Sequence, residues 1–177
     1  MKDLEFFLKG YKPSYYNTEL DEEFTKHLPE LMKSYPYIDK GIELMDDVQY
    51  YLFFQNDDLK MEFEDKMKGV LVRSPEFHEI LGNALGYPPK AVRFYGQAQR
   101  DTSLKKKKVG LHYASISCSS SIDDIVENAF WLWNTYFFED SQQKSLKVRI
   151  DTKMHKVSYR DKETLIKLQD AFFASAM

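Results

Sequence analysis

A chain of 177 residues, of which 43% are apolar and 15% aromatic, has enough material for a packed core, which excludes an intrinsically disordered chain. Its net charge is only −3, and its one cysteine, Cys118, excludes an internal disulfide. No stretch approaches the roughly 20 apolar residues of a membrane-spanning helix, and acids interrupt the apolar residues at the N-terminus, unlike in a signal peptide. We therefore expect a cytoplasmic protein that does not contact membranes.

The first half of the chain has helical patterns. Thr18 is placed to cap a helix that has acids in its first turn and Pro29 near its end. The apolar residues of this helix are Leu20, Phe24 and Leu28. Five more apolar residues recur at spacings of three and four, which predicts one face of another helix: Ile38, Ile42, Met45, Val48 and Leu52.

The next helix is predicted to start at Asp57 or Asp58, with Leu59, Phe63 and Met67 in line. The same segment also alternates between polar and apolar residues, so a strand stays open as an alternative. A stronger pattern follows at 74–76, where a serine that can cap a helix precedes a proline and an acid. This helix should run to Leu85 and stop at Gly86.

A second short helix should begin at Pro88-Pro89, so that residues 77–97 resemble a helix-turn-helix. The turn, Gly86-Tyr87-Pro88-Pro89-Lys90-Ala91-Val92-Arg93-Phe94-Tyr95, is similar to that of the mercury-resistance family of transcription regulators. The resemblance covers about one-eighth of the chain. It implies that the second helix lies in the major groove of DNA, with Lys90 and Arg93 facing phosphates or bases.

This region is also the most basic part of the chain. Residues 88–110 contain seven bases and one acid, whereas residues 1–66 contain 16 acids and 8 bases. Such asymmetry is typical of a surface for an anionic partner, although we expect the run at 105–108 to be a solvated turn. The candidate nucleic-acid or anion contacts are Lys90, Arg93, Arg100, Lys105, Lys106, Lys107 and Lys108.

The pattern changes after residue 104. Val109–Cys118 favours a strand, and Ser121 resembles the first residue of a capping box for the next helix. Two alternating segments follow, with Asp151-Thr152-Lys153 as the turn of a hairpin, and Asp161 caps a last helix. We expect the centre of the core to consist of Ile125, Ala129, Phe130, Trp133 and Phe137.

These elements predict the α+β class. A helical N-terminal half, about residues 1–100, should be followed at 104–177 by a small antiparallel sheet in the order strand-helix-strand-strand-helix. We expect residues 1–177 to form a single domain, because no change in composition divides the chain.

No local motif for catalysis, a cofactor or a metal is present. The four histidines lie far apart, and we expect Cys118 to be a buried structural thiol. His112 would lie about 20 Å from that thiol on one continuous strand, too far to act as its base. The alternative of an enzyme whose site assembles only in three dimensions stays open.

The sequence thus favours a small intracellular binding protein without catalytic activity, an inhibitor or regulator that acts through protein–protein contacts. The alternative is a nucleic-acid-binding regulator that uses residues 77–97 and 105–108. The 20 lysines against 5 arginines suggest an AT-rich genome, such as that of a low-GC bacterium or its phage. The sequence specifies neither the partner nor the oligomeric state.

Overall fold

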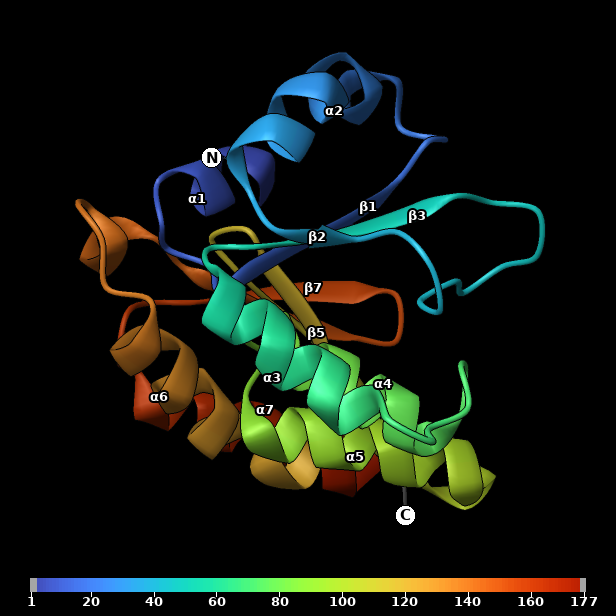
Figure 1. Cartoon of the computed structure of the whole chain (residues 1–177). Coiled ribbons are helices and arrows are strands. Elements are labelled where there is room, and N and C mark those ends of the chain that lie inside the picture. The colour runs from blue at the N-terminus through green and yellow to red at the C-terminus, as the bar shows by residue number, and fades with distance from the viewer. Residues whose placement is uncertain (1–2, 176–177) are drawn as a thin grey trace. The chain divides into compact units, whose positions relative to one another are not determined.

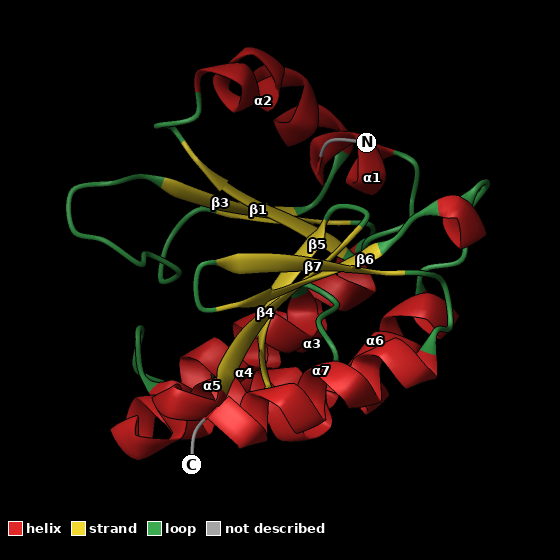
Figure 2. Cartoon of the chain, turned by 180° about the vertical axis from the view of Figure 1, so that it is seen from behind, coloured by secondary structure: helices red, strands yellow, loops and turns green. Residues whose placement is uncertain are grey.

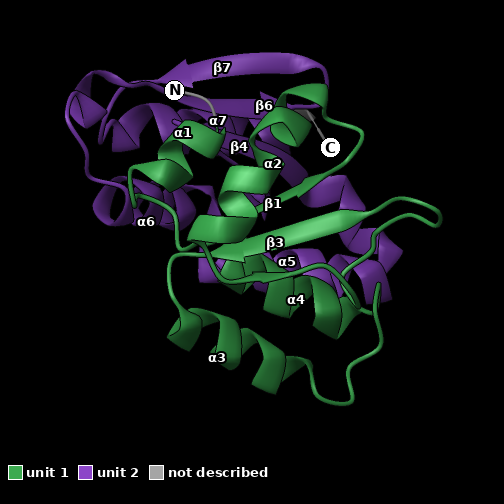
Figure 3. Ribbon diagram, turned by 45° about the horizontal axis from the view of Figure 1, so that its top comes forward, with its two compact units in different colours: residues 1–86 green, residues 87–177 purple. Residues whose placement is uncertain are grey.

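A computed structural model describes residues 3–175. The chain forms two compact units, Met1–Gly86 and Tyr87–Met177, and each contains helices and one antiparallel sheet (Figures 1 and 3). The predicted α+β class is therefore confirmed. That all 177 residues form a single domain stays a prediction, since it depends on whether the two units unfold together.

Unit 1 contains a three-stranded sheet in the order β1-β3-β2. Tyr15 pairs with Phe53, and Ile38 with Leu52. Aromatic residues of the helices and strands form its core, in which Phe7, Phe24 and Phe53 are buried. The elements are α1 (Asp3–Leu8), β1 (Ser14–Thr18), α2 (Glu22–Ser34), β2 (Tyr37–Ile38), β3 (Tyr50–Phe54), α3 (Asp57–Met67) and α4 (Pro75–Ala84).

The expectation of a helical N-terminal half is only partly correct, because residues 3–100 contain α1 to α5 but also three strands, and residues 38–52 form β2, a long loop and β3 instead of a helix. Gly41 and Asp47 have left-handed backbones, with φ of 73° and 59°, which a helix does not accept. Tyr50–Phe54 is a continuous run of aromatic and apolar residues. Its burial stabilises it more as the central strand of the sheet than as a helix. The helical spacing of the apolar residues is therefore coincidental.

Helix α2 starts later than predicted, because Thr18 belongs to β1 and Asp21 is the capping residue. The Asp21 carboxylate accepts hydrogen bonds from the backbone N–H groups of Glu23 and Phe24, at 2.9 and 3.0 Å. The helix also continues through Pro29 to Ser34, and Pro29 lies on its exposed side.

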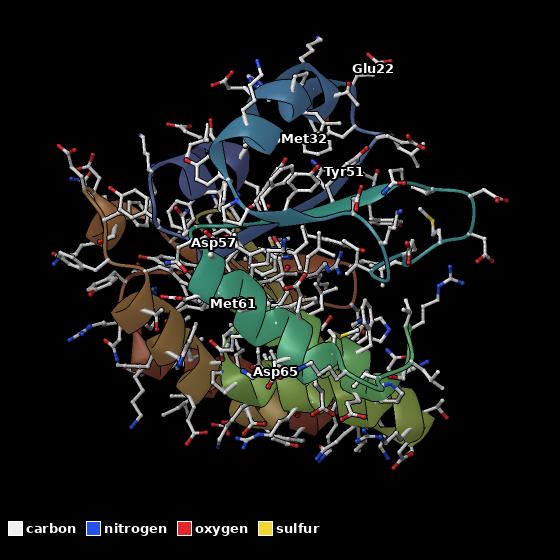
Figure 4. All side chains as sticks on the ribbon, in the orientation of Figure 1. Glu22, Met32, Tyr51, Asp57, Met61 and Asp65 are labelled. Atoms are coloured by element: carbon white, nitrogen blue, oxygen red, sulfur yellow. The ribbon has the colours of Figure 1, made fainter. Side chains whose placement is uncertain are left out.

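Segment 57–67 is a helix, and the strand alternative is wrong. Asn56 caps it by accepting from the N–H of Leu59 at 3.0 Å. Asp57, Met61 and Asp65, four residues apart, lie exposed along one side of α3 (Figure 4). The capping prediction for α4 is confirmed, since Ser74 Oγ accepts from the N–H of Phe77 at 3.1 Å. Gly86 follows that helix with φ of 73°.

Unit 2 contains a four-stranded sheet in the order β5-β4-β6-β7 (Figure 2). Every neighbouring pair of these strands is antiparallel. The elements are α5 (Pro89–Arg100), η1 (Thr102–Lys107), β4 (Lys108–Tyr113), β5 (Ile116–Ser121), η2 (Ile122–Asp124), α6 (Ile125–Thr135), η3 (Ser141–Gln143), β6 (Leu146–Ile150), β7 (Lys153–Val157) and α7 (Lys162–Ser175).

The predicted strand Val109–Cys118 is in fact most of a hairpin. The chain reverses at Ala114-Ser115, where Ala114 has φ of 52°, and Tyr113 pairs with Ile116. Neither turn residue is a glycine, asparagine or aspartate, so the local sequence does not predict the turn. The order after η1 is therefore strand-strand-helix-strand-strand-helix. The second hairpin, at Asp151-Thr152, is confirmed.

The predicted core of unit 2 is correct except at its end. Ile125, Ala129 and Trp133 are fully buried and Phe130 is partly buried. Phe137, however, is 65% exposed. Helix α6 ends at Thr135, so the helical period stops there and Phe138 is buried instead. The cap of α7 is confirmed, because Asp161 accepts from the N–H of Thr164 at 3.0 Å.

Candidate anion-binding surface

Two of the seven predicted anion contacts are already paired with acids. Lys90, on α5, contacts Asp124 at 3.2 Å and also pairs with Glu127. Hydrogen bonds from Lys90 to Glu127 and Asp124 raise the pKa of its ammonium group above the usual value. Lys107 pairs with Asp123 at 2.8 Å. These two lysines therefore have their charges balanced within unit 2.

Lys90 and Lys107 line a cleft of about 230 Å³ between α5, η1 and η2. Its walls hold both basic side chains and the acids Asp123 and Asp124. An anion in this cleft would meet two carboxylates at the start of α6, so the cleft is unsuited to a phosphate.

The other predicted residues lie on the surface. Arg93 and Arg100 are exposed on α5, which buries Ala91, Val92 and Ala98 on its other side. Lys108 lies over the ring of Tyr95, 5.9 Å from its centre. Lys105 and Lys106 are exposed in η1, and neither pairs with an acid among residues 3–175. Lys105, Lys106 and Lys107 thus end the 3₁₀-helix η1, and Lys108 is the first residue of β4.

We expect the double variant Lys105→Gln/Lys106→Gln to change the free energy of unfolding by less than about 0.5 kcal/mol, because exposed unpaired lysines contribute little. Its binding to nucleic acid should also match that of the unmodified protein. Urea denaturation and a binding titration would check this. Strong destabilisation would show that these lysines have structural partners.

A second basic surface, which the sequence analysis missed, is one face of the four-stranded sheet. The strand register places His112 opposite Ser117 on one side and Lys147 on the other, and Lys147 opposite Lys156. A neighbouring row joins Ser119, Gly110, Arg149 and Met154 in the same way. Lys147, Arg149 and Lys156 are exposed, and none of them pairs with an acid in the described part of the chain.

No aspartate or glutamate occurs in any of the four strands, whereas they contain five lysines and arginines. Like charges directly opposite one another destabilise a sheet, so the Lys147–Lys156 pair is locally unfavourable. The alternation of Lys147 and Arg149 with apolar residues was visible in the sequence, but it is also typical of any solvent-exposed strand face. Only the pairing of β4, β6 and β7 brings these charges together.

His112 lies in the middle of this face. Its Nδ1 is 2.9 Å from Ser117 Oγ, and its Nε2 is buried without a hydrogen-bond partner among the residues that the structure describes. A Cβ atom at Gly110 would lie 3.3 Å from His112 Nε2 and 3.3 Å from Arg149 Nε, so the missing side chain leaves room for both groups. Burial, together with the charges of Arg149 and Lys147, lowers the pKa of His112 below its usual value.

Cys118 lies on the opposite face of the sheet, paired with Leu111. The expected separation of about 20 Å from His112 is wrong, because the hairpin places the two residues on neighbouring strands. His112 still cannot act as the base of the thiol, since the two side chains point to opposite faces. Burial raises the pKa of the thiol to about 12.

We expect Cys118 to react slowly with a thiol reagent at pH 7, because a pKa of about 12 leaves almost no thiolate. Denaturation should raise the labelling rate to that of an unstructured cysteine. Mass spectrometry of the modified protein over time would measure both rates. Rapid labelling of the native protein would contradict the structural role.

Other kinds of site find little support. Among residues 3–175 no group of three or more histidine, cysteine or acidic side chains is arranged to hold a metal ion. Unit 1 has a pocket of about 310 Å³ with Phe54, Leu59 and Phe63 in its wall, and the charged groups beside it, Glu62 and Lys66, pair with each other at 2.5 Å. No helix within the described residues is both long and apolar enough to span a membrane.

Comparison with protein-family models gives no match, and neither does comparison with curated proteins or with solved structures. The resemblance to mercury-resistance regulators therefore finds no support there. Its first helix, α4, ends unit 1 and its second, α5, begins unit 2. The candidate sites are therefore surfaces of the individual units.

Proposed function

We propose that this chain is a binding protein that holds nucleic acid by its phosphates on the basic sheet face of unit 2. The basic sheet face consists of Lys108, Gly110, His112, Ser117, Ser119, Lys147, Arg149, Met154 and Lys156. The observation that supports the proposal is the complete absence of acids from the four strands, together with exposed bases that pair with no acid among residues 3–175. In nucleic-acid complexes such bases replace the counterions of the phosphates.

The distribution of charge between the units favours the same partner. Unit 1 contains 18 acids and 10 bases, whereas unit 2 contains 10 acids and 15 bases. A positive unit attracts a polyanion over distances of about 10 Å at physiological salt. The acids of unit 1 would repel the same polymer and so restrict it to unit 2.

The composition of the face also indicates what kind of recognition to expect. It has hydroxyl and ammonium donors for phosphates but no phenylalanine, tyrosine or tryptophan on which a base could stack. We therefore expect binding with little preference for base sequence. A helix-turn-helix that uses Arg93 would instead discriminate between sequences.

The test is the triple variant Lys147→Gln/Arg149→Gln/Lys156→Gln. We expect its salt slope, the fall of log affinity with log salt concentration, to be shallower by about two to three units than that of the unmodified protein, since each phosphate contact contributes about 0.7–0.9. Fluorescence anisotropy with a labelled single-stranded oligonucleotide and with a duplex would measure it.

The matched control, Lys26→Gln/Lys33→Gln/Lys40→Gln, removes the same charge from exposed positions of unit 1 and should leave the slope unchanged. An Arg93→Ala variant distinguishes the sheet face from the helix-turn-helix alternative. If the helix-turn-helix binds DNA, this variant should discriminate less between duplex sequences; if the sheet face binds, it should not. Equal salt slopes for the triple variant and the unmodified protein would refute the sheet face as the binding site.

A contact with a protein partner is the second proposal, and two loops of unit 1 favour it. Arg73 joins them, since its Nε donates to the carbonyl of Glu43 at 3.0 Å and its guanidinium pairs with Asp46 at 2.7 Å. Beside these contacts Met45 is 50% exposed and Leu71 is 78% exposed. Exposed apolar side chains on two loops that are held together by such contacts are typical of a protein interface.

A pull-down from a lysate, with and without nuclease, distinguishes the two proposals. Proteins bound through nucleic acid should be lost after nuclease treatment. A partner of the two loops should resist nuclease but be lost from a Met45→Asp/Leu71→Asp variant. Retention of the same proteins by that variant would exclude the loops as the interface.

A further inference from the structure

We infer that His112, Lys147 and Arg149 form a subsite for one phosphate group, and that His112 takes up a proton when the phosphate binds. The inference rests on the proposed function for the source of the phosphate, a nucleic-acid backbone. The subsite lies at the centre of the basic sheet face.

Gly110 lies at the centre of this subsite. The ring of His112 and the side chain of Arg149 both approach this residue, in space that any larger residue would occupy. Lys147 flanks His112 on the neighbouring strand. Three nitrogen-bearing side chains thus meet on one small area of sheet, where a tetrahedral anion can accept from each of them.

The Nε2 atom of His112 is buried and has no hydrogen-bond partner among the described residues. A buried polar atom without a hydrogen bond is energetically unfavourable, so a ligand that pairs with it is favoured. Nδ1 is already hydrogen-bonded to Ser117 Oγ, so Nε2 is the ring atom left for a ligand. Movement of the exposed Arg149 side chain would open this atom to a phosphate oxygen, and a protonated ring would donate to it.

Proton uptake follows from the charges that face the ring. Lys147 and Arg149, both on β6, act on His112 from one side, and Lys156 continues the row on β7. The neighbour on β5 is the neutral Ser117, and no carboxylate contributes among the described residues. In the free protein burial and these cations lower the pKa of His112 and so favour the neutral ring. A bound anion offsets the cations and raises the pKa of the ring.

This rise in the pKa of His112 determines whether affinity increases or decreases with pH. A group whose pKa is higher in the complex binds a proton on association, so affinity is greatest at low pH and falls as pH rises between the free and bound pKa values. Affinity should change by up to tenfold for each unit of difference between the two pKa values. The phosphodiesters of an oligonucleotide keep a constant charge in this range and do not obscure the effect.

The experiment follows the ring signals of the histidines by NMR between pH 5 and 8 in the full chain. Three samples are compared: the free protein, the protein with a short oligothymidylate, and the protein with sulfate, a free tetrahedral anion of constant charge. We expect the titration midpoint of His112 to rise when the oligonucleotide is added. His155, on the other face of the same sheet, and His78, in unit 1, serve as references.

Two pairs of variants complete the test. His112→Gln should remove the pH dependence of oligonucleotide affinity, while His155→Gln should retain it. Lys147→Gln should weaken binding several-fold, while Lys153→Gln, which removes the same charge from the opposite side of the same hairpin, should not. Folding of each variant is checked by its melting curve.

The outcomes distinguish the phosphate subsite at His112 from the proposed binding of nucleic acid. Salt-dependent oligonucleotide binding with an unmoved His112 midpoint would overturn the subsite and leave the proposed function intact. A midpoint that rises with sulfate, without any oligonucleotide binding, would support the subsite and overturn nucleic acid as its ligand. A midpoint that moves with neither anion would also overturn the subsite.

Discussion

Replacement of Trp133 by alanine is expected to lower the free energy of unfolding by about 3–5 kcal/mol, because the ring is fully buried and the site cannot collapse around alanine. The rings of Phe130 and Tyr159 lie 5.3 and 5.8 Å from it, both edge-on. A loss of this size is a large part of the 5–15 kcal/mol that stabilises a typical domain. Urea denaturation followed by circular dichroism would measure it.

Phe137→Ala is the matched control for this prediction. Phe137 is 65% exposed just beyond the end of α6, so its removal should change stability by less than about 0.5 kcal/mol. Trp133→Phe gives a further check. It should be milder than alanine, since it keeps an aromatic ring and removes the indole N–H, which is buried without a partner. An unchanged denaturation midpoint for Trp133→Ala would contradict the assignment of the core.

Replacement of Phe53 by alanine should have an effect of similar size in unit 1, again about 3–5 kcal/mol. Phe53 is fully buried on the central strand β3, and the rings of Tyr37 and Phe24 lie 5.6 and 6.2 Å from it. Its loss would leave a cavity in the aromatic core of that unit. Denaturation followed by far-ultraviolet circular dichroism would report the change.

The two alanine variants together test the predicted single domain. Both tryptophans, Trp131 and Trp133, lie in unit 2. Tryptophan fluorescence therefore reports on the unfolding of that unit alone, while circular dichroism reports on both units. If the chain is one cooperative domain, Phe53→Ala should shift the fluorescence transition as much as the circular dichroism transition. A fluorescence transition that Phe53→Ala leaves in place would show that the units unfold independently.

The elements predicted correctly from sequence are those that local interactions determine. Ser74 and Asp161 cap their helices through backbone N–H groups only three residues away, and Asp151 lies at a tight hairpin turn. Such features depend on a few consecutive residues, so they are visible without any tertiary structure. The burial of Trp133 belongs here too, because the apolar stripe of α6 is itself local.

The missed elements depend on residues far apart in the chain. The three strands of unit 1 were not predicted, because Tyr50–Phe54 becomes a strand by pairing with residues about 36 positions earlier, Ser14–Thr18. The predicted anion contacts at 90–108 were chosen from the density of bases. That density does not show that Asp123, Asp124 and Glu127 lie beside Lys90 and Lys107.

The sequence by itself determined the α+β class, the absence of an internal disulfide, most of the helices and the helical part of the unit 2 core. Local propensity, capping and apolar periodicity suffice for these features. Only the tertiary structure decided which lysines and arginines pair with acids and which of them lie together on one exposed face. His112 and Lys147 are 35 positions apart in the chain, and hydrogen bonding between β4 and β6 makes them neighbours on one face. Strand register is a long-range property, and it is what makes the basic sheet face a candidate site.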